Sequence, residues 1–373
     1  MLELTSYKME EHKGSNLYWQ NSIVEFDRYN LIIGKNASGK SQLFNRLSFL
    51  KSIHVKNSQT PSIISTAKFE LTFRDIDSNE VIIYDLTVHP GQLLTEKITN
   101  SSKNIVLFSS ETKEFFNEQE KKQVKQLFPP QHSVTKLISG SEKIFPTIKK
   151  LGDFFEGVRL LRTDKYNPSN LAVGPGHFIP DENLNNLGSV VLQWKQSMPH
   201  LYTELLNTFK TFFFEIQDFV AVNLPNIPYP ILGFAEKNVS EVVNQIDCSM
   251  GMLRVLGIIA LSISKDSVTG KVPSLIIIDE IDNGLDYENV GSILEYLVER
   301  STDSQIFFSS HSPVTCNFIS PSHWRVFSRK GIAVHARVPT ENPETAKLLQ
   351  DAKMTNWEIY QKHISKSKLY TVQ

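Results

Sequence analysis

The residues with the clearest chemistry form one glycine-rich segment near the start of the chain. The segment GKNASGKS, from Gly34 to Ser41, matches the phosphate-binding pattern G-x-x-x-x-G-K-[ST] at every fixed position. The pattern predicts that Lys40 contacts the β- and γ-phosphates of a nucleotide and that the Ser41 hydroxyl binds Mg²⁺. The predicted nucleotide-binding residues of this segment and of the position after it are Gly34, Asn36, Ala37, Ser38, Gly39, Lys40, Ser41 and Gln42.

Two carboxylates at the end of an apolar run supply a second set of reactive groups. Four branched apolar residues, Leu275 to Ile278, are typical of a central parallel strand that is buried on both faces. Ligands of open α/β sheets bind at the carboxyl ends of such strands. We therefore expect Asp279 to be a second Mg²⁺ ligand and Glu280 to be the general base that activates an attacking water.

Three later stretches carry further polar groups that suit a phosphate site. Ser249 and Gly251 begin an apolar helix, and the N–H groups and dipole of a helix start attract anions. Asp286 ends a turn that follows the acidic strand. His311 follows another buried strand, one helix length further on. The spacing predicts that the two strands are neighbours and that His311 reaches a γ-phosphate.

Short strands and helices must position these groups. An apolar strand over 30–33 and a helix over 42–50 flank the phosphate loop, which turns backbone N–H groups toward a ligand. Alternating patterns predict a mostly antiparallel patch built from strands at 2–7, 22–26, 68–73, 81–88 and 103–108. Its aromatic residues Tyr7, Tyr18 and Trp19 are either candidates for stacking on adenine or ordinary half-buried sheet residues.

The middle and the end of the chain carry weaker signals. Residues 111–150 are charged and favour a helix with a solvated face, with a DNA or partner contact as the alternative; residues 163–190 favour a long loop. A second helical pattern covers 188–220, and three prolines, Pro225, Pro228 and Pro230, follow it. Beyond His311 the sequence predicts a hairpin over 325–334 and a helix over about 343–363.

The composition indicates an ordinary folded protein. The chain has 373 residues, 40% hydrophobic and 21% charged, with a formal net charge of -1. This net charge does not indicate nucleic-acid binding, although a local basic face is compatible with it. Two cysteines, Cys248 and Cys316, imply no disulfide framework, and no apolar run has membrane-spanning length. Since the N-terminus also lacks a secretory signal pattern, we expect a cytoplasmic protein without a membrane partner.

The order of these motifs resembles that of the ABC-type ATPases of the SMC and RecF group. The segments around Ser249 and His311 look most like the shorter branch found in OLD-family proteins and in stand-alone ATPases of bacterial anti-phage systems. The resemblance is specific over 22–50 and 245–315. It implies that ATP is the nucleotide and that Ser249 and Gly251 cap the γ-phosphate of an ATP held by a second subunit. It also implies that Asp279 is the Walker B acid.

The same resemblance implies roles for several other residues. Asp286 is the D-loop acid, Glu280 the catalytic base, His311 the switch histidine and Gln92 a candidate Q-loop glutamine. Two details depart from the family pattern. The signature differs from the commoner Ser-Gly-Gly-Gln form, and Gly-Leu-Asp replaces Gly-Leu-His.

The expected fold is an α/β P-loop NTPase of ABC-ATPase type. It has a mixed central sheet, an antiparallel β subdomain, an inserted helical region and no long coiled coil. We expect four segments along the chain. They are an N-terminal ATPase lobe (1–110), a mainly helical or loop insertion that senses or contacts a partner (111–245), a C-terminal ATPase lobe (246–340) and a helical tail (341–373).

The resemblance implies an ATP-hydrolysing switch that works as a head-to-tail homodimer or a larger oligomer. Only about sixty residues follow His311, too few for the TOPRIM nuclease of OLD proteins. We therefore expect a separate effector, such as a TOPRIM or HNH nuclease or a toxin, in anti-phage defence, with DNA or a phage protein as the trigger. The alternatives are a RecF-like repair ATPase that binds DNA directly and a scaffold that hydrolyses ATP weakly.

Overall fold

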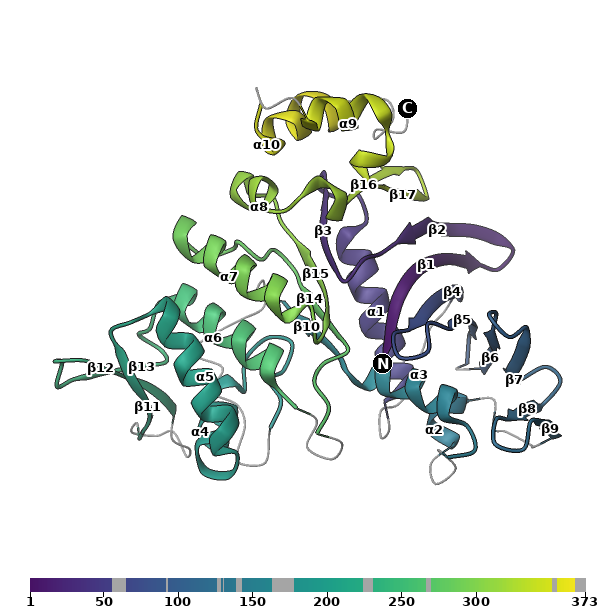
Figure 1. Cartoon of the computed structure of the whole chain (residues 1–373), viewed down its shortest axis with the longest axis horizontal. Helices are drawn as coiled ribbons and strands as arrows, with labels where there is room; N and C mark the ends of the chain where they lie inside the picture. The colour runs from purple at the N-terminus through teal and green to yellow at the C-terminus, as the bar shows by residue number, and fades with distance from the viewer. Residues whose placement is uncertain are drawn as a thin grey trace. The chain divides into compact units, whose positions relative to one another are not determined.

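The computed structural model describes residues 1–55, 65–91, 93–125, 129, 131–138, 143–162, 178–223, 231–265, 270–350 and 354–365. Three features of the sequence analysis lie outside these ranges. They are Gln92, most of the predicted loop at 163–190, and the prolines Pro225, Pro228 and Pro230. The chain forms two compact units: Met1–Val158 with Ile319–Gln373, and Arg159–Phe318. The first unit is therefore assembled from both ends of the chain (Figure 1).

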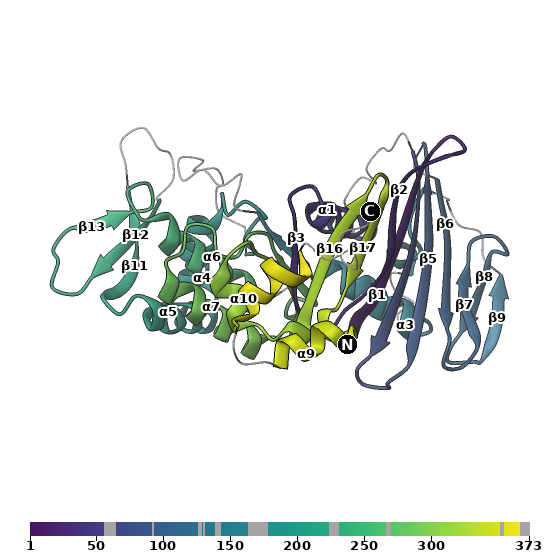
Figure 2. The same cartoon turned by 90° about the horizontal axis from the view of Figure 1, so that it is seen from above.

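The first unit is built on a long mixed run of strands. Their order is β3-β16-β17-β2-β1-β4-β5-β6-β7-β8-β9, in which β3 with β16 and β17 with β2 are parallel and the other described pairs are antiparallel. Figure 2 shows β5 and β6 side by side. The bounds are β1 (Leu2–Lys13), β2 (Asn16–Glu25), β3 (Tyr29–Gly34), β4 (Thr66–Asp75), β5 (Val81–His89), β6 (Leu93–Asn100), β7 (Ile105–Ser109), β8 (Glu114–Asn117), β9 (Lys122–Lys125), β16 (Trp324–Lys330) and β17 (Ala333–Arg337).

Helix α1 (Lys40–His54) follows β3 directly through the glycine-rich loop. Its buried face contains Leu43, Leu47 and Leu50, the three residues that the sequence pattern placed on one side. The other helical elements of this unit are α2 (Val134–Leu137), α3 (Pro146–Glu156), α9 (Pro343–Gln350), α10 (Asn356–Ile359), the 3₁₀ turns Pro321–His323 and Pro339–Glu341, and the π-helical turn Tyr360–Ile364.

A buried polar cluster fixes the end of α1 against the sheet. The His54 ring lies within hydrogen-bond distance of Thr135 Oγ1 (2.9 Å), Ser133 Oγ (3.1 Å) and Tyr84 Oη (3.2 Å). Glu96 accepts hydrogen bonds from Tyr84 and Ser133. Burial lowers the pKa of His54 to about 3 and raises the pKa of Glu96. The cluster therefore places an uncharged histidine beside a carboxyl group whose pKa is raised by burial.

The second unit carries a short run of strands in the order β10-β14-β15. Strands β14 and β15 pair in parallel from Leu275 opposite Gln305 to Ile278 opposite Phe308, so the predicted neighbouring strands are confirmed. A separate antiparallel sheet has the order β11-β12-β13. The bounds are β10 (Val158–Leu161), β11 (Ile216–Val222), β12 (Ile231–Glu236), β13 (Val242–Asn244), β14 (Leu275–Ile278), β15 (Gln305–Ser309), α4 (Leu187–Ser197), α5 (Pro199–Phe212), α6 (Met250–Ile263), α7 (Tyr287–Arg300) and α8 (Pro313–Phe318).

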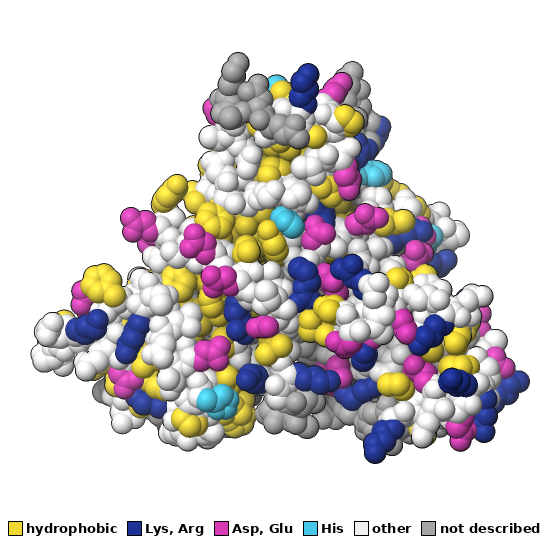
Figure 3. Space-filling view, in the orientation of Figure 1, with side chains coloured by type: hydrophobic (Ala, Val, Ile, Leu, Met, Phe, Trp, Pro, Cys, Tyr) yellow, Lys and Arg dark blue, Asp and Glu magenta, His cyan; other side chains and the backbone are white. Residues whose placement is uncertain are grey.

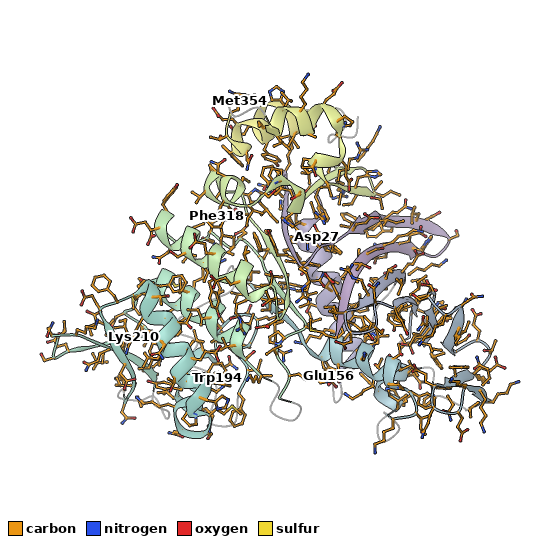
Figure 4. All side chains as sticks on the ribbon, in the orientation of Figure 1. Asp27, Glu156, Trp194, Lys210, Phe318 and Met354 are labelled. Carbon is orange, nitrogen blue, oxygen red and sulfur yellow. The ribbon has the colours of Figure 1, made fainter. Side chains whose placement is uncertain are left out.

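The core of the second unit surrounds helix α6. Eleven consecutive residues of this helix, from Leu253 to Ile263, are buried, in agreement with their apolar composition. Trp194 of α4, labelled in Figure 4, is fully buried and donates its indole N–H to the carbonyl of Phe178. No helix among the described residues is long and apolar enough to cross a membrane.

The structure corrects several sequence-based predictions of helix. The polar segment within 111–150 contains strands β8 and β9 before α3 begins. In β8, Phe115 and Asn117 are buried while their neighbours are not, and this two-residue period outweighs the helical preference of the charged residues around it. The helix expected over 188–220 ends at Phe212, and Phe214 is 68% exposed. The segment 111–245 is therefore less helical than expected, since it also holds β10 to β13.

Candidate functional site

The loop between β3 and α1 adopts a backbone that few residue types tolerate. Its φ angles are +155° at Gly34, +62° at Ala37 and +106° at Gly39. A Cβ atom on Gly34 would lie 2.4 Å from the carbonyl oxygen of Phe327 and 2.7 Å from Ser38 Oγ. Only glycine fits at this position, because a Cβ would push against the neighbouring strand β16.

One buried polar group of the loop has no protein partner in the part of the chain that the structure describes, and another donates within the loop. Ser38 is buried, and its hydroxyl has no hydrogen-bond partner among the described residues. Such orphaned buried groups are rare in folded proteins, so this hydroxyl is available to a ligand or to water. The Lys40 ammonium is buried and donates to the carbonyl oxygens of Gly34 (2.8 Å) and Lys35 (3.3 Å). Lys40 thus places its charge against the inner edge of the loop.

Helix α1 begins without a side-chain cap. Gly39 is its N-cap residue and provides no side-chain oxygen, so the N–H groups of the first turn lack a side-chain acceptor at this end. Ser41 and Gln42 are exposed on this turn. The arrangement fits a phosphate group, because the first-turn N–H groups, the helix dipole and the Lys40 ammonium all favour an anion.

A cavity of about 540 Å³ opens beside the loop at the carboxyl ends of β3 and β16. Its volume falls in the range of small-molecule sites. It is lined by Gly34, Lys35, Asn36, Ala37, Ser38, Val326, Phe327, Ser328, Arg329, Gly331, Tyr360 and Ser365.

The three aromatic residues proposed near the nucleotide have different environments. Tyr7 is fully buried, which raises the pKa of its hydroxyl and prevents its ring from stacking on a ligand. Tyr18 is half exposed, with the Lys13 ammonium 3.9 Å from its ring centroid. Trp19 lies 3.5 Å from the position of a Cβ on Gly39, and the Arg329 guanidinium covers its ring at 4.3 Å. Of the three, Trp19 is therefore placed next to the phosphate loop.

In the second unit, Asp279 and Glu280 follow β14, where the parallel strands end. Ser309, the last residue of β15, joins the two acids. Its hydroxyl donates to Asp279 Oδ1 (2.5 Å) and accepts from the Glu280 N–H (2.8 Å). Its carbonyl accepts from the Ile281 N–H at 2.9 Å. The turn after β14 is therefore fixed to the end of β15 by one serine.

Arg254 of α6 holds the other side of the same turn. The guanidinium donates to the carbonyl oxygens of Asp279 (3.2 Å), Glu280 and Ile281 (3.2 Å). Arg254 is only 4% exposed, and burial lowers its pKa to about 10 although the nearby carboxylates act in the opposite sense. The side chain consequently stays charged at neutral pH, and its fork of donors matches three successive carbonyl groups.

Glu280 has a left-handed backbone, with φ at +51°. A residue that is not glycine costs roughly 1–3 kcal/mol in this conformation, and such strain concentrates at functional sites. The Glu280 side chain is exposed, whereas Ile281 beside it is fully buried. The turn thus presents the Glu280 carboxylate to solvent at the end of a buried strand.

The signature segment and the turn after Glu280 lie against each other. Ser249 is the N-cap of α6, and its hydroxyl accepts from the Met252 N–H at 3.1 Å. A Cβ on Gly251 would lie 2.8 Å from the Gly284 carbonyl oxygen. Asp286 caps α7 by accepting from the N–H of Asn289 (2.8 Å) and from its side-chain amide, and these bonds lower the Asp286 pKa.

The predicted site residues therefore fall into groups. The phosphate-loop residues lie in the first unit. Asp279 and Glu280 meet through Ser309 and Arg254 in the second unit, and exposed His311 follows two residues after Ser309. Sequence reasoning assigned no role to Ser309 or Arg254. A signal for Arg254 was present, because a charged residue inside an apolar helix requires buried partners.

Comparison with solved structures identifies the fold. The crystal structure of the SmcHead bound to the C-winged helix domain of ScpA matches at 12% identity and a TM-score of 0.52, covering 90% of this chain and 96% of that chain. The SMC head domain from Thermotoga maritima matches at 11% identity with a TM-score of 0.45 (90% and 98% covered). The Smc head domain derived from Pyrococcus furiosus matches at 12% with 0.49 (95% and 100% covered). The first likeness shows the fold, that of the SMC-head type of ABC ATPase.

The family follows from the sequence. Residues 29–317 match the AAA_21 family, described as "AAA domain, putative AbiEii toxin, Type IV TA system". The match covers well over half of the chain, and the chain belongs to this family. No curated protein matches the chain. The expected fold class and the resemblance to stand-alone ATPases of the SMC type are confirmed.

Proposed function

We propose that this ATPase hydrolyses ATP in the presence of Mg²⁺ and that its nucleotide state switches a separate effector on and off. The observation that carries the proposal is the pair Asp279–Glu280 at the end of a buried parallel strand, in a chain whose phosphate loop is complete. The backbone of Gly34 and the orphaned hydroxyl of Ser38 support the assignment of the loop to a phosphate ligand.

The proposed roles follow from the chemistry of each group. Lys40 and the first-turn N–H groups of α1 bind the phosphates, and Ser41 and Asp279 would hold Mg²⁺, which offsets charge on the phosphate oxygens. Glu280 accepts a proton from the attacking water. His311 contacts the γ-phosphate. Each role belongs to this proposal.

We include dimerisation in the proposal because the chain has one phosphate loop and one signature. In a head-to-tail pair, Ser249, Gly251 and Asp286 of one copy would face the ATP that the other copy holds. Ser249 and Met250 are exposed at the start of α6, as this role requires. The family description names a putative toxin and a toxin–antitoxin system, and the defence setting with a separate effector is part of this proposal. The ScpA domain bound to the related SmcHead shows that a head of this fold can receive a partner protein.

The face shown in Figure 3 gives no specific support for direct DNA binding. Cationic and anionic side chains are interspersed on the face shown in Figure 3, in agreement with the net charge of -1. A DNA-binding ATPase would lose affinity steeply as salt rises, because phosphate contacts release counterions. Titration with duplex DNA at two salt concentrations would detect that behaviour.

The test of the hydrolytic role is the turnover of two variants. Glu280→Gln should reduce ATP turnover by roughly 10²–10⁴-fold and leave ATP binding intact, because it removes the base and keeps the shape. Lys40→Ala should abolish ATP binding or turnover, because it removes the cation that faces the phosphates. Unchanged turnover in Lys40→Ala would refute the phosphate site, and lost ATP binding in folded Glu280→Gln would refute its role as base.

The test of the switch is the mass in solution of the Glu280→Gln protein with and without ATP and Mg²⁺. A rise in mass that depends on nucleotide is the expected result, since blocked hydrolysis should trap the closed dimer. A monomer under both conditions would contradict the dimer. An oligomer that does not depend on nucleotide would favour the scaffold interpretation, with ATP bound inside a preformed assembly.

A further inference from the structure

We propose that Ser309 and Arg254 are positioning residues, which hold the Glu280 backbone in its left-handed conformation and thereby aim the Glu280 carboxylate at the attacking water. The inference rests on the proposed role of Glu280 as the base. It goes beyond that role because it explains what keeps an exposed carboxylate in one place. We call the pair of contacts, Ser309 on the Glu280 N–H and Arg254 on the Glu280 carbonyl, the backbone clamp.

The Ser309 side of the clamp acts on two groups at once. Its hydroxyl accepts from the Glu280 N–H at 2.8 Å and donates to Asp279 Oδ1 at 2.5 Å. Ser309 is fully buried at the end of β15, with its own carbonyl bonded to the Ile281 N–H. The hydroxyl therefore has little freedom to rotate, and it fixes the start of the Glu280 peptide relative to Asp279.

The Arg254 side of the clamp acts on the opposite end of the residue. The guanidinium donates to the carbonyl oxygens of Asp279, Glu280 and Ile281. It therefore holds Glu280 and the residue on each side of it. Arg254 is almost wholly buried and retains its charge. Lysine cannot replace this contact, because an ammonium is a compact point charge without the planar fork of donors.

The conformation held by the clamp requires such support. At φ +51° a glutamate backbone is strained, and relaxation to an ordinary region would swing the Cα–Cβ bond to another direction. The Glu280 side chain is exposed, so packing does little to fix the carboxylate. Displacement of a catalytic group by about 1 Å can cost roughly 10²-fold in rate. The backbone clamp is therefore the feature that ties the carboxylate to the core.

The test compares ATP turnover and ATP binding in Ser309→Ala, Ser309→Thr and Arg254→Lys at saturating ATP and Mg²⁺. Ser309→Ala and Arg254→Lys should lower kcat by roughly 10–100-fold, as loss of a supporting contact commonly does, with ATP affinity unchanged. Ser309→Thr keeps the hydroxyl and should recover most of the rate. The matched controls are Ser262→Ala and Arg300→Lys. Both residues are buried or half-buried in the same unit, and their polar contacts involve neither Asp279 nor Glu280. Both controls should turn over ATP normally.

Two further measurements separate positioning from other effects. In the Glu280→Gln background, Ser309→Ala should add no further loss of rate, because residues that act as a unit are not additive. Excess Mg²⁺ should not restore Ser309→Ala, since restoration would mean that the contact serves Asp279 alone. A normal kcat in folded Ser309→Ala, additive losses, or rescue by Mg²⁺ would each overturn the clamp. If Glu280→Gln itself retains full turnover, the proposed function fails first, whatever the clamp variants do.

Discussion

At the scale of single residues, the site depends on backbone positions as much as on side-chain chemistry. Gly34 approaches the strand β16 so closely that a methyl group has no room, while Glu280 accepts a conformation that glycine would adopt freely. The first position excludes a side chain for steric reasons. The second keeps a side chain despite strain, as the proposed role of its carboxylate would require.

Gly34→Ala should weaken ATP binding by roughly 10²-fold, because the added Cβ would lie 2.4 Å from the Phe327 carbonyl oxygen and displace the loop. Isothermal titration with ATP and Mg²⁺ measures the loss. The matched control is Gly14→Ala, which also has a positive φ but no atom within 4 Å of its Cβ. Equal affinity of Gly34→Ala and the natural chain would show that the loop relaxes at no cost.

At the scale of elements, the candidate site residues lie at helix ends, and clusters of buried side chains hold those helices in place. The start of α1 faces the predicted phosphates, and its last residue, His54, enters the polar cluster with Tyr84 and Glu96. The His54 ring also stacks on Phe155 of α3, with centroids 4.0 Å apart. The helix that bears Lys40 is thus anchored at the end remote from the ligand.

Acid should weaken the first unit through His54. Its folded pKa of about 3 lies below the ordinary 6.5, so the unfolded chain binds the extra proton and stability falls as the pH drops from 6.5 toward 3, by at most about 1.4 kcal/mol per pH unit. Glu96 opposes this effect, because its raised pKa lets the folded state take up a proton first. Urea unfolding at pH 7 and pH 5 should show a smaller loss for His54→Gln than for the natural chain. An identical loss in both proteins would contradict the role of His54.

Helix α7 contains a glycine at which a substitution should raise the stability of the fold. Gly291 lies inside this helix, and a Cβ there would meet no atom within 4 Å. Gly291→Ala should therefore raise the free energy of unfolding by about 0.4–1 kcal/mol, because alanine restricts the unfolded chain more than glycine does. Chemical denaturation measures the gain. Gly257→Ala is the matched contrast in α6: its Cβ would lie 2.3 Å from the Leu184 side chain, so it should destabilise.

At the scale of the whole molecule, two exposed apolar side chains lie beside signature and D-loop residues. Met250 is 45% exposed next to Ser249, and Tyr287 is 74% exposed next to Asp286. Large apolar side chains next to functional residues suit a contact surface between proteins. In the proposed dimer, these two residues would be covered by the second copy.

Met250→Arg should prevent the ATP-dependent rise in mass of the Glu280→Gln protein, because it places a charge in the proposed interface. ATP binding by the single chain should remain. Light scattering with and without ATP measures the mass, and Phe214→Arg, which changes an exposed residue between α5 and β11, is the control. A dimer that forms normally with Arg at position 250 would place the interface elsewhere.

Local patterns in the sequence predicted the strand–loop–helix of the phosphate site, the acidic strand and its parallel neighbour, because each rests on residues close in the chain. Contacts between distant segments could not be predicted in the same way. The hydrogen bonds from Arg254 to three carbonyl groups after β14 depend on how α6 packs. Strand β8 was not predicted, because the charged residues around it prefer a helix. The individual roles of Lys40 and Glu280 are predictions that the turnover variants test, and the role of His311 stays a prediction.

The composition of the first unit from both chain ends has a consequence for synthesis of the protein. Strand β3, which leads into the phosphate loop, pairs with β16, and β2 pairs with β17, although almost the whole chain separates the partners. A ribosome adds roughly 5–20 residues per second, so β3 waits for β16 for a time on the order of tens of seconds. Because Phe327 of β16 packs against Gly34, a prematurely terminated chain lacks one wall of the phosphate loop. We therefore expect nucleotide binding only once β16 has been synthesised, and chains that stop before β16 should be unable to compete for ATP.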